Sequence, residues 1–289
     1  MPATLVANVV ASGLLTGLVY GLMSLGLSVI FGVVRVVNFA HGEMTVVAMY
    51  AAFVLFTAWG LDPLVALVPV ALGLFIIGYA LQAALINPFI ARPDHEQFIL
   101  LVGIALIITN GLLMVFGPDA RHVDLPYAYD SIGLGPLLVD KVRVYAAGMA
   151  LLVTAALFAF FRYSRTGTAI RASADNLLGA AIVGLDFKRL YALTFGIGAA
   201  CAGAAGALLI LIEDATPQSA PAFTLLAFII VIVGGLGNMA GALLGGILIG
   251  LSEALAGLFI DPSLKSIFSF VLLVLVLVLR PQGLLGAAR

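Results

Sequence analysis

Polar side chains interrupt an otherwise apolar chain at two places. Residues 37–43 read VNFAHGE and residues 234–238 read GGLGN, and each stretch separates two apolar runs. Polar groups are costly at membrane depth, and transporters place them at broken helices along the path of a solute. A later apolar run also contains a carboxylate. The residues that we expect to face a solute path are Asn38, His41, Glu43, Gly235, Gly237, Asn238 and Glu253.

A purely structural interpretation of the same residues stays open. The first break also fits an interfacial loop, a helix cap or a packed turn, with Arg35 at the cytoplasmic edge of the membrane. Each single polar residue can instead bond to a neighbouring helix, as polar groups in membrane bundles usually do. The two breaks lie in opposite halves of the chain, as in transporters built from internal repeats, but their similarity is too slight to establish a duplication.

The sequence has no pattern typical of catalysis or of metal binding. It contains no glycine-lysine phosphate loop, no His-Glu-x-x-His pair and no Gly-x-Ser-x-Gly elbow. Cys201 is the single cysteine, which excludes an internal disulfide and argues against a cysteine-based metal site. A net charge of -1 without a basic tract gives no indication of nucleic-acid binding. We therefore expect neither enzymatic activity nor a metal or cofactor bound by this chain.

The elements that must position the polar residues are membrane helices. Of the 289 residues, 63% are hydrophobic and 9% are charged, whereas soluble domains are about a quarter charged. Apolar blocks of roughly 20 residues match a ~30 Å hydrocarbon core and lack the alternation of barrel strands. We predict an all-α, polytopic transmembrane bundle that forms one domain over residues 1–289, with about eight or nine membrane segments, some broken or re-entrant. The predicted segments are 5–34, 44–58, 64–86, 98–116, 144–161, 190–212, 224–237, 239–257 and 266–280.

Glycine spacing predicts how these helices pack. Gly13, Gly17 and Gly21 are spaced four apart, and so are Gly246 and Gly250. Small residues at this spacing form one face of a helix and let a second backbone approach closely. We therefore expect close helix contacts through these faces.

Basic residues predict the orientation. The densest group lies in the connection 162–189 and consists of Arg162, Arg165, Arg171, Lys188 and Arg189. The positive-inside rule places this connection in the cytoplasm, and counting spans backwards places 117–143 and the N-terminus outside. The centre of the connection is nevertheless semi-apolar, which a solvated spacer does not require. Both a docking helix for a cytoplasmic partner and a helix packed on its own bundle remain open.

Three stretches together resemble the LivH-type inner-membrane permeases of branched-chain amino acid ABC importers. The first covers residues 17–43 and ends in NFAHGE. The second, RYSRTGTAIRASADNLLGAAIVGLD, covers 162–186 and precedes a small-residue helix. The third combines GGLGNMAGALLGGILIGLSEAL with RPQGLLG near the C-terminus. The resemblance extends over nearly the whole chain.

This resemblance implies a multi-pass permease subunit of the bacterial inner membrane, with no chemistry of its own. It implies as partners a second, LivM-type permease, two cytoplasmic ATP-binding subunits that hold the ATP and Mg, and a periplasmic solute-binding protein. The residues that it implies for coupling to an ATPase are Arg171, Asp175, Asn176, Ala180, Ala181, Gly184 and Asp186.

The transported solute does not follow from the resemblance. Such permeases handle branched-chain and other amino acids, amides, urea and carboxylates, and this chain has Thr224 where relatives carry a charged residue. Since no lysine or arginine lies inside the expected spans to pair with a carboxylate, we expect a small polar or zwitterionic solute. The alternative function is a self-sufficient secondary transporter or channel for a small solute such as urea.

Overall fold

The protein is a bundle of membrane-length helices. The structure is a computed structural model that describes residues 3–90, 92–135, 137–260 and 265–286. Within these residues, 8 helical segments are long and apolar enough to cross a membrane, and a shorter apolar helix follows. The corresponding helices are α1 (Ala3–Val34), α2 (His41–Trp59), α3 (Pro63–Leu81), α4 (Asp94–Phe116), α5 (Lys141–Tyr163), α8 (Phe187–Leu209), α9 (Ala220–Gly234), α10 (Met239–Phe259) and α11 (Lys265–Leu279). The predicted polytopic helical bundle is therefore confirmed.

Shorter elements lie outside these helices. A π-helical turn (Gln82–Ile86) and a 3-10 turn (Asn87–Phe89) extend α3, and a 3-10 turn (Pro217–Ser219) precedes α9. Two further helices, α6 (Arg165–Asp175) and α7 (Leu177–Ile182), connect α5 to α8. The chain also contains an antiparallel hairpin of β1 (Ser131–Leu134) and β2 (Leu137–Asp140). It belongs to a connection between spans, where water can satisfy the strand edges.

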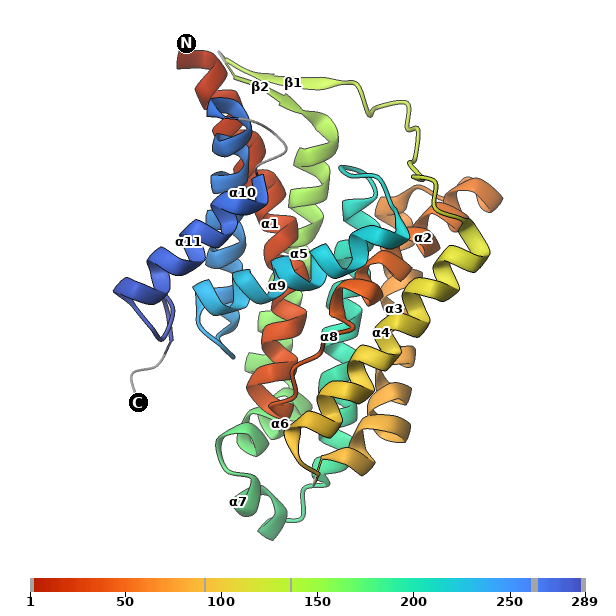
Figure 1. The fold of residues 1–289 in the computed structure, drawn as a ribbon, viewed down its shortest axis with the longest axis vertical. Coiled ribbons are helices and arrows are strands. Elements are labelled where there is room, and N and C mark those ends of the chain that lie inside the picture. Colours follow the sequence, from red (N-terminus) through yellow and green to blue (C-terminus); the bar gives the residue numbers. More distant parts are fainter. Residues whose placement is uncertain (1–2, 91, 136, 261–264, 287–289) are drawn as a thin grey trace.

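Helix α1 forms the centre of the bundle. It packs antiparallel against α10 on one side and contacts α8 on another (Figure 1). A Cβ added at Gly17 would lie 2.7 Å from the carbonyl oxygen of Gly246, so only glycine allows this approach of the two backbones. Gly13 and Gly21 face α10 in the same way. The predicted close contact through these glycine faces is confirmed.

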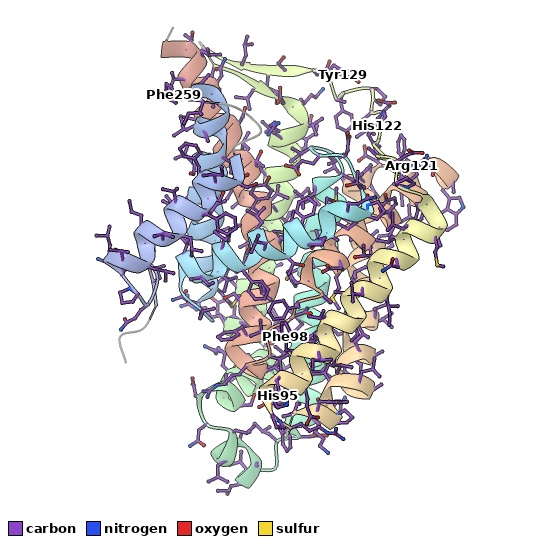
Figure 2. The ribbon with its side chains drawn as sticks, viewed as in Figure 1. His95, Phe98, Arg121, His122, Tyr129 and Phe259 are labelled. Carbon is purple, nitrogen blue, oxygen red and sulfur yellow. The ribbon has the colours of Figure 1, made fainter. Side chains whose placement is uncertain are left out.

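Different elements lie at the two ends of the bundle. The N-terminus and the β1–β2 hairpin lie at one end, and α6 and α7 lie at the other (Figure 1). Figure 2 shows the same separation for side chains, with His122 and Tyr129 at the hairpin end and His95 at the opposite end. We call the end with α6 and α7 the inner end, because the positive-inside rule predicts that it faces the cytoplasm.

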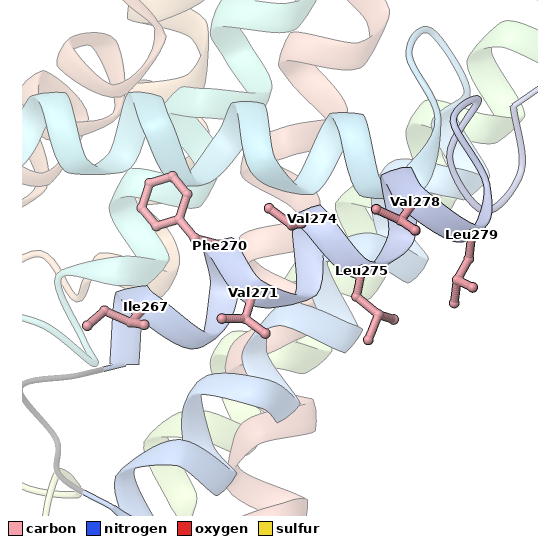
Figure 3. A pocket seen from close by; sticks show the side chains of 7 residues that line it. All are labelled: Ile267, Phe270, Val271, Val274, Leu275, Val278 and Leu279. Atoms are coloured by element: carbon pink, nitrogen blue, oxygen red, sulfur yellow. The ribbon is translucent and has the colours of Figure 1, made fainter.

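Two C-terminal helices have distinct surroundings. Helix α9 runs across the axis followed by α1, α5 and α8 (Figure 1). Helix α11 presents an exposed apolar row, shown in Figure 3, that suits contact with lipid. The row consists of Ile267, Phe270, Val271, Val274, Leu275, Val278 and Leu279.

Candidate functional site

The first predicted break lies deep inside the bundle. After α1 ends at Val34, residues 35–40 turn back, and α2 begins at His41. His41 Nε2 lies 2.9 Å from the carbonyl oxygen of Met23, which precedes the end of α1 by some eleven residues, or ~17 Å of helix. One turn further along α1, Gly26 packs against Gly198, the central residue of α8. The break therefore lies near the mid-length of α1 and α8, and it has the form of a packed turn with buried polar side chains.

The break meets the start of α9. Thr224 Oγ1 donates a hydrogen bond of 2.8 Å to Glu43 Oε2 and accepts one of 2.9 Å from the backbone N–H of Gly42. Glu43 is buried, and it stands in the first turn of α2 beside the first turns of α9. The N-terminal ends of both helices carry partial positive charge, so this is a favourable place for a carboxylate. A side chain at position 42 would collide with the backbone of α9.

The other polar residues of the break hold its shape. Asn38 is buried, and its Oδ1 accepts a hydrogen bond of 3.1 Å from the backbone N–H of Ala40, which is the local turn expected of asparagine. His41 is also buried and ties the start of α2 to the backbone of α1. Asn38 and His41 therefore fix the backbone of the break and its position against α1.

The second predicted break lies at a different depth. Gly237 packs against Gly32, about nine residues or ~13 Å closer to the inner end of α1 than Met23. Gly235 and Gly237 have φ of 109° and 77°, in the left-handed region that favours glycine. The structure thus pairs the first break with the start of α9 and places the second break closer to the inner end of α1.

A C-terminal segment braces this second break. Asn238 Oδ1 caps α10 by accepting from the backbone N–H of Gly241 at 2.9 Å, and its Nδ2 donates to the carbonyl oxygen of Leu285 at 2.7 Å. The N–H of Leu285 in turn donates to the carbonyl oxygen of Gly234 at 3.0 Å. The stretch RPQGLLG is therefore part of the break.

Glu253 lies in neither break but in a polar pocket near the outer end of α1 and α10. The pocket measures about 300 Å³ and also contains Tyr20, Arg143 and Glu213. The hydroxyl of Ser269 donates to Glu253 Oε1 at 2.9 Å. Arg143 is the third residue of the membrane-length segment Lys141–Tyr163 and therefore lies at the outer end of this helix.

Helices α6 and α7 form the inner connection between spans. The backbone turns after α7 in a Schellman motif, in which Gly184 N–H donates to Ala181 and Leu185 N–H donates to Ala180, each at 3.0 Å. Asn176 Oδ1 caps α7 at 2.8 Å from the backbone N–H of Gly179, and Asp186 caps α8. Gly184 has φ of 83°, which suits glycine at this position.

This connection exposes an apolar surface. Leu178, Ile182 and Val183 are 74%, 78% and 75% exposed. These three side chains therefore do not pack on the bundle of their own chain. Ala180 is 5% exposed and faces its own chain. Arg171 and Asp175 are exposed on the preceding helix. We name Leu178, Ile182 and Val183 the α7 surface.

Helix α6 also borders the second break. Arg171 and Asp175 line a groove of about 690 Å³ together with Gly237 and Asn238. Residues predicted to couple to an ATPase and residues predicted to face a solute path thus share one groove. Sequence reasoning did not find this juxtaposition, because 62 or more residues separate the two groups and no local pattern links them.

Comparison with known proteins adds an independent observation. A family model described as "Branched-chain amino acid transport system / permease component" matches residues 9–277. The chain is 31% identical over 294 residues to the high-affinity branched-chain amino acid transport system permease protein LivH of Salmonella typhimurium, covering 95% of this chain and 94% of that protein. It is 29% identical over 290 residues to BraD of Pseudomonas aeruginosa, a permease protein of the same description, with coverage of 95% and 94%.

A second type of permease is also similar. The chain is 27% identical over 302 residues to the permease protein LivM of Escherichia coli, covering 94% of this chain and 69% of that protein. No solved structure gives a significant match.

Proposed function

Because the chain belongs to the family of branched-chain amino acid transport system permease components, we propose that it is the membrane subunit of an ATP-driven importer. Its solute is a small amino acid, with a branched-chain amino acid as the leading candidate, or a related amide or carboxylate. The subunit provides the path across the membrane and is not an enzyme. The energy comes from separate subunits, since the sequence has no phosphate loop.

The observation that carries this proposal is the exposed α7 surface at the basic end of the bundle. Three large apolar side chains project from a short helix whose two ends are fixed by caps. Exposed apolar residues outside the hydrocarbon region are typical of a protein interface. Because both ends of α7 are held by caps, a displacement of α7 by a docked subunit would also move α6 and α8.

The assembly that we propose has four further components. Similarity to both LivH and LivM supports a second, related permease beside this one. Two cytoplasmic ATP-binding subunits would dock on the α7 surface and its equivalent in the second permease. A solute-binding protein would deliver the solute at the end with the β1–β2 hairpin. The location that we propose for the complex is a bacterial inner membrane, as for its bacterial relatives.

The shared groove suggests how docking of an ATPase subunit would affect the solute path. Arg171 and Asp175 on α6 face the same groove as Gly237 and Asn238. A displacement of α6 would therefore press on the second break, which joins α9 to α10. The first turns of α9 contact Glu43 of the first break through Thr224. Closure of the ATPase subunits would then change the packing of the first break.

Nucleotide-dependent uptake tests the proposal. The permease, its LivM-type partner and the two ATPases are reconstituted in liposomes with the binding protein, and uptake of radiolabelled L-leucine, L-glutamine and urea is measured with ATP or with a non-hydrolysable analogue. We expect uptake of an amino acid with ATP only. Uptake by the permease alone, without ATPases or nucleotide, would instead support the secondary transporter or channel.

A further inference from the structure

The outer pocket combines charges of both signs in a confined space. Arg143 from α5, Glu213 from the loop after α8 and Glu253 from α10 line it together with Tyr20 of α1. Its volume of about 300 Å³ lies at the lower end of the range for small-molecule sites. The four residues come from separate elements, so the tertiary fold alone brings them together.

Arg143 is positioned to receive a carboxylate. Its Nε donates to Asp140 Oδ2 at 2.9 Å, and one terminal nitrogen donates to Thr16 Oγ1 at 2.6 Å. These two bonds hold the guanidinium in place but use only part of its five N–H donors. The remaining N–H donors on its two terminal nitrogens can donate to the carboxylate of a ligand.

Glu213 is positioned to receive an ammonium group. The hydroxyl of Tyr20 donates to its Oε1 at 2.8 Å. A carboxylate has about four acceptor positions, so one such bond leaves capacity for an ammonium. Among the ion pairs between described residues, none involves Glu213. Glu253 lines the same pocket, where it accepts a hydrogen bond from Ser269.

From these contacts we propose that the outer pocket is a binding site for an amino acid in its zwitterionic form. The carboxylate of the ligand meets Arg143, and its ammonium meets Glu213. A ligand that carries only one of these two charged groups makes only one of the two contacts. Asn8 accepts a hydrogen bond of 3.1 Å from the backbone N–H of Leu138 in β2, so the pocket lies next to the hairpin.

This inference rests on the proposed function for its biological meaning, since an outer amino-acid site is where an importer would receive its solute. The site can still be tested without transport. Ser12 lines the pocket, and cysteine is nearly isosteric with serine. The native Cys201 is buried and can be replaced by serine to give a background without reactive thiols.

The experiment measures labelling of Ser12→Cys, in the Cys201→Ser background, by a membrane-impermeant methanethiosulfonate reagent in nanodiscs. The ligands are L-leucine, its deaminated analogue 4-methylpentanoate and its decarboxylated analogue 3-methylbutylamine. We expect L-leucine to slow labelling and each analogue to do so at about tenfold or higher concentration, since each lacks one charge-assisted contact. Arg143→Gln and Glu213→Gln should weaken protection by L-leucine to a similar degree.

Asp214→Asn is the matched control, because Asp214 is an exposed acid next to Glu213 that does not line the pocket. It should leave protection by L-leucine unchanged. The inference is overturned if the cysteine is not labelled, if L-leucine gives no protection, or if 4-methylpentanoate protects as well as L-leucine. Because labelling needs neither ATPases nor nucleotide, a negative result here with normal ATP-driven uptake would remove the site and leave the proposed function intact.

Discussion

Thr224 Oγ1 lies 2.8 Å from Glu43 Oε2 and thereby joins the start of α9 to the start of α2, 181 positions apart in sequence. The contact is buried inside the bundle, where an unpartnered carboxylate is costly. Both helices have their first turns here, and α9 then runs across the axis followed by α1. Residues 35–40 lead into α2, and residues 210–219 lead into α9, as non-helical or short helical chain. The pair forms the centre of the contact between α2 and α9.

Removal of the Thr224 hydroxyl should destabilise this centre. In Thr224→Val the side chain keeps its shape, but Glu43 loses a donor and the Gly42 N–H loses an acceptor. We expect a loss of about 1–3 kcal/mol in unfolding free energy, together with impaired uptake, because buried polar groups are left unsatisfied. Thermal unfolding in detergent and liposome uptake measure the two effects.

Two comparisons make the Thr224 prediction specific. Thr224→Ser keeps the hydroxyl and should restore most of both properties. Thr57→Val removes an exposed hydroxyl on α2 that bonds only to carbonyls of its own helix, and it should change stability by less than about 0.5 kcal/mol. If Thr224→Val and Thr57→Val lose the same amount of unfolding free energy, the contact between Thr224 and Glu43 contributes no specific stabilisation.

A methyl group at Gly42 should separate α2 from α9. The added Cβ of Gly42→Ala would collide with backbone atoms of Ala220 and Thr224, which cannot rotate away. We expect a destabilisation of about 1–3 kcal/mol, as for other overpacked positions. Gly73→Ala is the control, because nothing lies within 4 Å of a Cβ there, and it should be neutral or slightly stabilising. The melting temperatures of both purified variants test the prediction, and equal values would contradict it.

A charge on the α7 surface should prevent docking of an ATPase subunit. Ile182→Asp places a carboxylate at a site that is 78% exposed, so the isolated permease should fold normally. We expect loss of co-purification with the ATPase and loss of ATP-driven uptake, because docking would bury an unpaired charge. Tyr129→Asp makes the same kind of change at an exposed aromatic residue of the outer loop (Figure 2) and should leave docking intact.

The choice of position matters for the docking test. Gly184 lies in the same turn, but its φ of 83° makes any side chain there strained, so Gly184→Trp would disturb the turn itself. Ile182→Asp avoids this ambiguity. Normal uptake by Ile182→Asp would contradict the assignment of α7 as the docking helix.

The amide oxygen and the amide nitrogen of Asn238 should each contribute to stability. Asn238→Ala removes both the cap of α10 and the bond to Leu285, and we expect a loss of about 1–2 kcal/mol. Asn238→Asp keeps an oxygen for the Gly241 N–H but loses the donor to the Leu285 carbonyl. Its stability should lie between those of Asn238→Ala and the parent protein. Thermal unfolding compares the three proteins, and equal stability of the aspartate and alanine variants would argue against the cap.

The sequence by itself determined the helical segments, the small-residue faces through which helices such as α1 pack closely, and the semi-apolar character of the connection at the basic end. Length, apolar content and four-residue spacing are local properties, and they act on a helix before it meets its neighbours. The same patterns could not distinguish the depth of 37–43 from that of 234–238, because both read as polar interruptions between apolar runs.

Only the tertiary structure decided which polar residues meet. Glu43 meets Thr224, Arg143 shares a pocket with Glu213 and Glu253, and Arg171 shares a groove with Asn238. These partners come from different helices, and their proximity depends on how far each helix slides and rotates against the next. That register is set by packing of whole helix faces, chiefly the glycine contacts of α1, and no short stretch of sequence records it.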